Sequence, residues 1–281
     1  MDACIQPNNT NILIEPLSSA HEINGNMSQL IASFDPISLS EMDSVKLMNR
    51  VDTKFLIGSK QLNVLLQKAQ EHYRIVEIDG LRITPYSTIY FDTEDARMYM
   101  MHHNGKLNRY KIRMRSYVNS GISFLEIKNK NNKGRTSKKR IGITSNQFEL
   151  KELEEVGTEF IQQTINEPFS LVPKLQILFH RITLVDKYLT ERVTLDTRLS
   201  FQNMADEASQ SVDGLVIVEM KQNGANSSHF KKYLDELRIN SASMSKYCMG
   251  MALVNSNFKS NRFKNKLRKI NKITISNHGT N

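Results

Sequence analysis

Cysteine is scarce in this sequence, and long apolar runs are absent. The two cysteines, Cys4 and Cys248, lie far apart, so neither a disulfide framework nor the close spacing of zinc ligands is present. That usage fits a reducing compartment. The first residues lack a basic region followed by an apolar stretch, so they do not resemble a secretory signal. No segment approaches the ~20 apolar residues needed to span a bilayer. We therefore expect a cytoplasmic protein that is at most peripheral to a membrane.

Two common nucleotide-binding motifs are also missing, and acidic residues are in deficit. Neither G-x-x-x-x-G-K-[ST] nor G-x-G-x-x-G occurs in the chain. The 38 Lys and Arg residues outnumber the 29 Asp and Glu residues, which gives a net charge of +9. This excess favours a phosphate-rich partner, such as nucleic acid, nucleotide, polyphosphate or an anionic membrane surface. The 281 residues, 39% of them hydrophobic, suffice for one large domain or two small ones.

Three regions differ along the chain. We predict a loosely ordered leader at 1–35, the main domain at 36–257 and a basic tail at 258–281. Strand patterns lie at about 50–57, 73–78, 86–92, 107–117, 122–129, 135–143, 175–187, 190–202 and 214–221, and helical patterns near 38–49, 62–69, 145–165, 230–237 and after 243. Strands follow one another more often than they alternate with helices. We therefore predict a β-dominated α+β fold built on an antiparallel sheet or barrel.

The strand pattern at 109–117, R-Y-K-I-R-M-R-S-Y, carries the strongest charge signal. Alternate side chains of a strand point to opposite faces, so Arg109, Lys111, Arg113 and Arg115 share one face. The other face is apolar. Four like charges in a row are tolerable if solvent screens them, or if an anion lies among them.

Other predicted strands repeat this alternation. Their charged faces hold Asp52 and Lys54; Glu126 and Lys128; Lys138 and Arg140; Arg181; Arg192, Asp196 and Arg198; and Glu219 and Lys221. Two arrangements satisfy the pattern. Either the charges face water while the apolar face covers a core, or the sheet closes with its charges inside and its apolar face under helices. The first is commoner, but the excess of bases and the repeated Glu-x-Lys favour the second. A carboxylate beside a lysine can hold a divalent cation whose phosphate ligands the lysine contacts.

Nine segments, in order, resemble the vacuolar transporter chaperone (VTC) domain, within the triphosphate tunnel metalloenzyme (CYTH-like) superfamily. They are N-R-V-D-T-K-F (49–55), Y-S-T-I-Y-F-D-T (86–93), H-H-N-G-K-L-N-R-Y-K-I-R-M-R-S-Y (102–117), F-L-E-I-K-N-K (124–130), G-R-T-S-K-K-R (134–140), H-R-I-T-L (180–184), R-V-T-L-D-T (192–197), V-E-M-K (218–221) and S-M-S-K-Y-C-M-G (243–250). The resemblance implies a closed, tunnel-like antiparallel barrel with a basic interior, flanked by helices. It also implies synthesis of polyphosphate from ATP with Mn²⁺ or Mg²⁺.

The same resemblance, with strand parity for Lys111, Arg140 and Arg192, gives the expected site. The residues expected at the reacting phosphoryl are Arg113, Arg115, Lys128 and Lys221. The other expected phosphate ligands are Lys54, Lys111, Lys138, Arg140, Arg181, Arg192 and Lys246, the last near one mouth of the tunnel. Glu219 is the expected metal ligand, and Glu126 is a weaker candidate that could instead balance the surrounding bases.

Some features depart from the pattern or leave alternatives open. The first strand reads Arg50-Val51-Asp52-Thr53-Lys54 where other superfamily members have Glu-x-Glu-x-Lys, which removes metal ligands and disfavours two-metal hydrolysis. The alternatives are a tunnel-type triphosphatase and a non-catalytic module that binds polyphosphate or nucleotide; no specific nucleic acid is expected. The basic tail is expected to be solvated, with peripheral membrane contact or a hold on exiting polyphosphate as alternatives.

Minor sites have plainer interpretations. We expect His102 and His103 in a turn between strands rather than at a metal. Cys248 is expected to be a buried apolar side chain, and Ser243 or Ser245 a helix cap.

Overall fold

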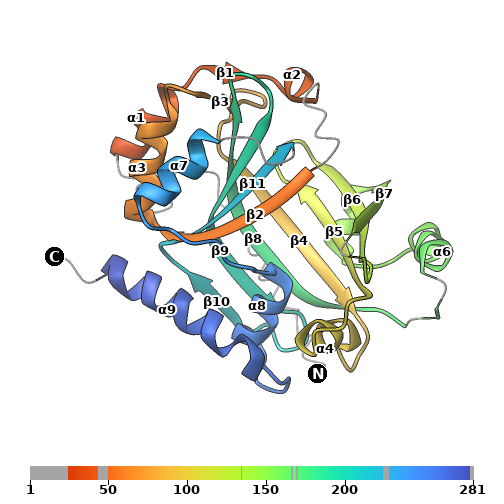
Figure 1. Cartoon of the computed structure of the whole chain (residues 1–281). Helices are drawn as coiled ribbons and strands as arrows, with labels where there is room; N and C mark the ends of the chain where they lie inside the picture. Colours follow the sequence, from red (N-terminus) through yellow and green to blue (C-terminus); the bar gives the residue numbers. More distant parts are fainter. Residues whose placement is uncertain are drawn as a thin grey trace, which may run out of the picture.

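The computed structural model describes residues 25–43, 50–133, 135–165, 167–168, 170–223 and 228–278. Its centre is an 11-stranded sheet whose main path runs β2-β11-β9-β8-β4-β5-β6-β7 (Figure 1). These strands are β2 (Arg50–Gly58), β11 (Leu215–Asn223), β9 (Glu191–Asn203), β8 (Val172–Asp186), β4 (Thr84–Asp92), β5 (Arg109–Tyr117), β6 (Ile122–Lys130) and β7 (Thr136–Ile143). Every neighbouring pair on this path is antiparallel. The β-dominated α+β class and the antiparallel sheet are thereby confirmed.

Three short strands lie off this path. β10 (Ser209–Val212) pairs with β9, and β3 (Tyr73–Val76) joins β8 to β1 (Pro36–Ile37), which runs parallel to β3. Apart from β1 and β10, each described strand matches a predicted one.

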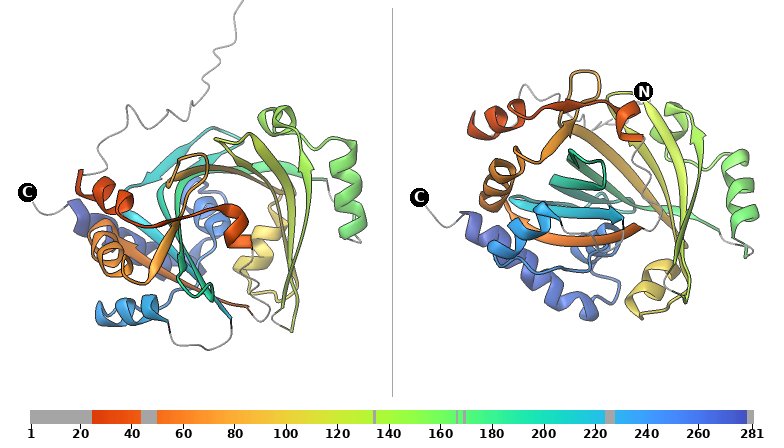
Figure 2. Two further views of the ribbon diagram at one scale, coloured as in Figure 1. Left: turned by 90° about the horizontal axis from the view of Figure 1, so that it is seen from above. Right: turned by 45° about the horizontal axis from the view of Figure 1, so that its top comes forward.

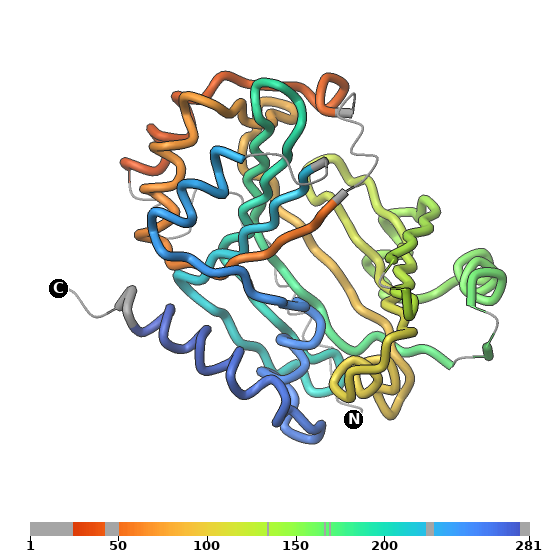
Figure 3. The backbone as a smooth tube through the Cα atoms, viewed as in Figure 1, coloured from red at the N-terminus to blue at the C-terminus, as the bar shows by residue number. Residues whose placement is uncertain are grey.

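The sheet curves so that β2 and the β5–β7 strands face each other across its concave side (Figure 2). Among the described residues, no ladder joins β7 to β2, so the predicted closure into a barrel is not confirmed. The edge of β2 that could pair with β7 contacts another segment of the chain instead. Figure 3 shows the segment between α7 and α8 running beside β2, where Ser241 bridges to Phe55 and the amide of Ala242 donates to the carbonyl of Lys54 at 2.7 Å. This segment occupies hydrogen-bonding groups that a closing strand would need.

The apolar face of the sheet is convex and covered by helices. One cluster packs Phe55 and Val218 of the sheet against Leu65 of α3 (Ser59–Ala69), Phe230 of α7 (His229–Glu236) and Ile31 of α1 (Gly25–Ala32). A second cluster packs the outer faces of β5 and β6 against α6 (Glu155–Thr164) and α5 (Ser145–Leu150). Burial of these faces under helices selects the second of the two arrangements, in which the charged faces turn inward.

Part of the concave side is filled by α8 (Lys246–Val254). Its residues pack on Leu175 of β8 and Phe201 of β9, both fully buried. A Cβ added at Gly250 would lie 2.5 Å from each of these side chains, so glycine permits the close approach. The carboxylate of Asp92 then ties α8 to α4 (Arg97–His103), because it accepts a 2.6 Å hydrogen bond from Tyr247 and 2.9 Å bonds from the amides at the start of α4.

The ends of the chain differ from expectation. Residues 25–32, predicted within a loosely ordered leader, form α1, while 1–24 lie outside the described residues. The basic tail, expected to be solvated, forms η1 (Asn261–Phe263) and α9 (Lys264–His278), because Phe263, Leu267 and Ile270 pack against the cluster around α8. Figure 1 shows α9 lying along the body. In the described part of the chain, no helix is both long and apolar enough to cross a bilayer.

Two local predictions have opposite outcomes. The helical pattern near 38–49 is confirmed at its start by α2 (Leu39–Asp43), where Ser38 and Glu41 form a capping box: the amide of Ser38 donates to Glu41 Oε2 at 2.9 Å, and the amide of Glu41 donates to Ser38 Oγ at 3.3 Å. The prediction of a turn at His102 and His103 is wrong, because both residues end helix α4, where His103 is buried against Phe263.

Candidate phosphate-binding site

The register of the sheet gathers the predicted basic residues on its concave face. Lys111 of β5 pairs with Lys128 of β6, and Lys128 pairs with Lys138 of β7. Toward the other end of the strand order, on the same face, Lys221 of β11 pairs with Arg192 of β9. Apart from Lys138, each of these residues has a chain neighbour in one of the convex apolar clusters. The predicted strand residues on the concave face are Lys54, Lys111, Arg113, Arg115, Lys128, Lys138, Arg140, Arg181, Arg192 and Lys221. The face is therefore strongly basic.

Arg113 is fixed by a buried network. Its Nε and Nη2 donate to Glu126 Oε2 at 2.8 and 2.6 Å, and its Nη1 donates to the hydroxyl of Tyr90 at 2.9 Å. Burial opposes ionisation of Glu126, but Arg113, Arg115 and Lys138 hold its pKa at about 2. Lys138 forms an ion pair with the other oxygen. Both oxygens of Glu126 thus face bases, which fits a counter-charge better than a metal ligand.

Arg115 and Lys128 lie beside this network, and neither forms an ion pair with a carboxylate of the described residues. The buried Nε of Arg115 has no hydrogen-bond partner in the described part of the chain. Burial and then the nearby Arg113 and Arg181 lower the pKa of Arg115 to about 10. The charge of Arg113, followed by burial, lowers the pKa of Lys128 to about 6. An anion placed between these side chains would relieve both effects.

A second cluster forms where α8 meets β8 and β9. Arg181 donates to both oxygens of Asp196, at 2.6 and 2.9 Å, and Lys246 donates to the same carboxylate. Burial is outweighed by these bases, which lower the pKa of Asp196 to about 2. Burial lowers the pKa of Lys246 to about 7. Lys246 was expected near a mouth, but it projects from the start of α8 into the Arg181 cluster, with its Nζ 3.3 Å from the ring centroid of Phe179.

Asp196 lies in the site, although the sequence prediction did not include it among the phosphate or metal ligands. Its position four residues after Arg192 indicated that both side chains share one face of β9. The prediction that Arg198 shares this face is wrong. A register shift between Leu178 and His180 inserts a bulge there, and Arg198 has a φ of +51°. After the bulge Leu199, not Arg198, joins the cluster under α8.

Glu219 lies among three bases on the concave face. Its Oε1 accepts a 2.7 Å hydrogen bond from Lys54, and its Oε2 lies 3.9 Å from Lys221. Despite burial, Lys221, Lys54 and Arg181 lower the pKa of Glu219 well below its usual range. The carboxylate is therefore ionised, with its closest contact at Oε1 and its Oε2 farther from a base.

The metal prediction can be tested against the donor set. No group of three or more His, Cys, Asp and Glu side chains occurs among the described residues. Mg²⁺ usually takes one or two carboxylates, several waters and substrate phosphates rather than an all-protein cage. Glu219 on this basic face fits such a shared site, and it does not fit a metal held by protein alone.

Ser245 and Cys248 follow their predictions. Ser245 Oγ caps α8 by accepting from the amide of Cys248 at 3.3 Å, and it also accepts from Lys111 Nζ at 3.0 Å. The Cys248 side chain is buried, its Sγ 3.0 Å from Nδ1 of His102. Burial raises the pKa of the thiol, so it is no activated nucleophile.

The family model of the VTC domain matches residues 49–255. The chain belongs to the VTC domain family. No curated protein matches this chain. A phosphate-related function follows from the family together with the basic concave face.

Three solved structures share features of the fold at low identity. A putative adenylate cyclase from Bacillus halodurans is 14% identical, with 74% of this chain and 100% of that chain covered and a TM-score of 0.47. A putative adenylyl cyclase from Hippeastrum, described as having a dominant triphosphatase activity, is 11% identical, with coverage of 72% and 95% and a TM-score of 0.43. The PH1012 protein from Pyrococcus horikoshii is 12% identical, with coverage of 67% and 88% and a TM-score of 0.36. Likenesses this distant carry no argument about activity.

Proposed function

We propose that this chain is a polyphosphate polymerase that transfers the γ-phosphoryl group of ATP to a growing polyphosphate chain. The observation that carries the proposal is the buried Nε of Arg115, which has no hydrogen-bond partner in the described part of the chain and lies beside the fixed Arg113. The positive charge of Arg113 and burial lower the pKa of Lys128 to about 6, so an anion bound here would restore the charge of that lysine. A polyphosphate or a nucleotide triphosphate supplies the matching negative charge.

Phosphoryl transfer asks little covalent chemistry of the protein, because catalysis rests on positioning and charge neutralisation. A terminal oxygen of the polyphosphate chain attacks the γ-phosphorus of ATP. One P–O bond forms, the bond from that phosphorus to the β–γ bridging oxygen breaks, and ADP leaves. Arg115 donates to phosphoryl oxygens beside Arg113, whose own donors are held by Glu126 and Tyr90 and which adds positive charge, whereas Lys128 and Lys221 act as point charges.

A divalent cation, Mn²⁺ or Mg²⁺, would be held by Glu219 together with phosphate oxygens. When bound, it neutralises charge on those oxygens. Lys54 and Lys221 contact the carboxylate in the free protein, so they keep Glu219 ionised and oriented toward the concave face.

Two rival functions use the same face. A triphosphatase would release phosphate, and a binding module would hold polyphosphate or nucleotide without turnover. Asp52 remains on the first strand, but Arg50 replaces the other acid of the superfamily pattern. The loss of that carboxylate weakens the case for a metal-activated water and favours transfer to phosphate.

The deciding experiment is incubation with ATP and Mn²⁺, followed by gel electrophoresis of the products and an assay of free phosphate. Polymer with matching ADP supports the proposal. Free phosphate without polymer identifies a triphosphatase, and ATP binding with neither product identifies a binding module. Arg115→Ala is the matched inactive control for each product.

We further propose a cytoplasmic location with electrostatic contact to anionic membranes through α9. The apolar side of α9 packs on the body through Leu267 and Ile270, while Lys264 and Arg268 are exposed. Contact would therefore use charge rather than insertion. Sedimentation with vesicles that contain or lack anionic lipid tests this; equal binding to both would contradict it.

A further inference from the structure

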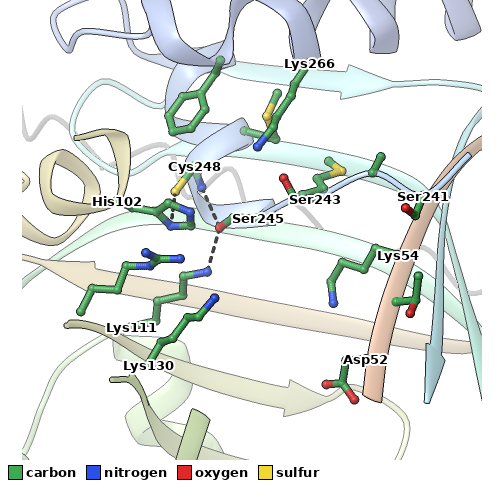
Figure 4. Close-up of a pocket in the computed structure, with 16 residues that line it drawn as sticks. Asp52, Lys54, His102, Lys111, Lys130, Ser241, Ser243, Ser245, Cys248 and Lys266 are labelled. Carbon is green, nitrogen blue, oxygen red and sulfur yellow. Dashed lines mark hydrogen bonds between the residues drawn. The ribbon is translucent and has the colours of Figure 1, made fainter. Parts of the chain in front are cut away.

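A cavity of about 400 Å³ adjoins the concave basic face. Figure 4 shows Asp52 and Lys54 of β2 on one side of the cavity, Lys111 and Lys130 on the other, and Lys266 of α9 above them. Lys54 and Lys111 also belong to the concave face. The cavity therefore borders the region assigned above to phosphate.

The register of β5 and β6 explains why bases gather here. Lys111 pairs with Lys128, and the next pair on the same face is Arg109 with Lys130. Residues two apart on a strand share a face and stand ~7 Å apart. The basic face thus continues by one further pair beyond the residues predicted as phosphate ligands.

This pair has no carboxylate to balance it. In the described part of the chain, Arg109, Lys130 and Lys266 form no ion pair, and Asp52 is the one acid that lines the cavity. Arg109 is held in place by a 2.6 Å hydrogen bond from its Nη1 to the carbonyl of Lys106. A group of bases around a cavity that holds few acids is suited to a polyanion.

Four of the bases that line the cavity lie close enough to His102 to affect its pKa. Burial, and after it the nearby bases Lys111, Arg109, Lys266 and Lys130, lower the pKa of His102 to about 3. The side chain therefore stays neutral at ordinary pH.

We propose that Arg109, Lys130 and Lys266, together with Lys111, form a second phosphate subsite that holds the polyphosphate chain rather than the nucleotide. The inference rests on the proposed function for the identity of the ligand. The cavity offers several cations, but the described residues that line it include no ring besides those of His102 and the buried Phe263, so they provide no open surface on which adenine could stack. Its ligand is a phosphate chain without a base.

The contribution of α9 lies outside the region that defines the family. The family model ends at residue 255, whereas Lys266 belongs to a helix that begins at Lys264. Lys266 is set over the ring of Phe263, 5.8 Å from its centroid. The C-terminal helix, rather than the barrel-like sheet, thus completes the subsite.

The test compares two ligands that differ in length. The variants are Lys130→Gln and Lys266→Gln, with Lys272→Gln as a control that removes the same charge from an exposed position of α9. Calorimetry without metal gives the Kd of long-chain inorganic polyphosphate and of a non-hydrolysable ATP analogue at fixed ionic strength. We expect each subsite variant to weaken polyphosphate binding ~3–10-fold and to reduce the salt dependence of log Kd by about one charge. The analogue should bind within ~2-fold of wild type, and Lys272→Gln should change neither ligand, since one exposed charge far from the ligand is screened.

Equal weakening of both ligands would overturn the proposal, because the bases would then belong to a diffuse field. Unchanged polyphosphate affinity in both subsite variants would overturn it as well. Circular dichroism confirms that each variant is folded. The measurement uses no turnover, so it separates the two proposals: a chain that binds polyphosphate through Lys130 and Lys266 yet makes no polymer from ATP keeps the subsite and loses the polymerase.

Discussion

Arg113 and Arg115 lie two residues apart on β5, but their surroundings differ. Arg113 makes three hydrogen bonds to Glu126 and Tyr90, whereas the Nε of Arg115 has no partner among the described residues. A guanidinium that is already satisfied by protein holds the architecture of the site. One that lacks a partner is free to bind substrate and to meet charge that develops in the transition state.

Substitution of these two arginines should therefore have different effects. Arg115→Ala should lower turnover ~10²–10³-fold with little loss of stability. Arg113→Ala leaves the carboxylate of Glu126 buried with one fewer base, which should cost about 3 kcal/mol of unfolding free energy. Steady-state kinetics and urea denaturation of both variants check this. Equal, modest effects on rate with unchanged stability would show that neither arginine is special.

Glu219→Gln tests the metal ligand, because the exchange keeps shape and removes charge. Metal-dependent turnover should be abolished while the fold is retained. The variant also leaves Lys54 and Lys221 without their carboxylate, so metal-free tripolyphosphate should bind more tightly than to wild type. Titration with Mn²⁺ and calorimetry without metal measure the two effects. Near-normal synthesis at limiting Mn²⁺ would remove Glu219 from the metal site.

Lys246 predicts a pH dependence of ligand binding. Burial lowers its pKa to about 7; Asp196 opposes the shift, and Arg181 and Arg115 add to it. The free protein therefore loses this proton as the pH rises through about 7, whereas a bound phosphate favours the charged form and raises the pKa. Binding of tripolyphosphate at pH 8 should take up protons, and affinity should fall above pH 7. Calorimetry in buffers of different ionisation enthalpy measures the uptake. Lys246→Arg, which stays charged, should reduce it; an unchanged uptake would contradict the assignment.

At the scale of the elements, strand alternation predicted most of the sheet and the face on which the bases lie. It could not predict the bulge at Arg198, because one inserted residue reverses parity without any change in composition. The position of α8 in the concave side was also beyond local patterns, since it depends on contacts between Gly250 and residues about 50 to 75 positions earlier. We predicted a solvated tail because basic residues outnumber apolar ones in its sequence. The few apolar residues nevertheless form a narrow stripe on α9 that packs against the cluster around α8. Asp196 was not predicted as a site residue, because its partner Lys246 lies on α8, whose position the sequence could not indicate.

Gly250→Ala tests how closely α8 must approach the sheet. The new Cβ would lie 2.5 Å from the buried side chains of Leu175 and Phe201, which have little room to move. The strain should outweigh the gain in helix propensity and cost about 1–2 kcal/mol of unfolding free energy. Gly142→Ala, which adds a Cβ with nothing within 4 Å, is the control. Urea denaturation that finds the two variants equal would show that α8 is loosely packed.

At the scale of the whole molecule, the two faces of the sheet differ in charge. The convex face supplies two apolar cores under helices, whereas the concave face holds one apolar cluster under α8 and concentrates positive charge from strands far apart in sequence. The net charge of +9 is therefore less informative than its placement. Folding brings like charges together, so the free protein gives up stability to hold a surface that its ligand would complete.

That balance predicts how the whole protein responds to anions. Tripolyphosphate at ~100 times its Kd should stabilise the fold by about 2.7 kcal/mol and raise Tm by several degrees, because it binds the folded state alone. Sodium chloride at matched ionic strength should raise Tm less, since it screens the bases without bridging them. Arg115→Ala should lose much of the response to tripolyphosphate and keep the response to salt. Thermal denaturation followed by circular dichroism measures all three. If chloride and tripolyphosphate gave equal shifts, the concave face would be a diffuse positive field, and a defined triphosphate site would not exist there.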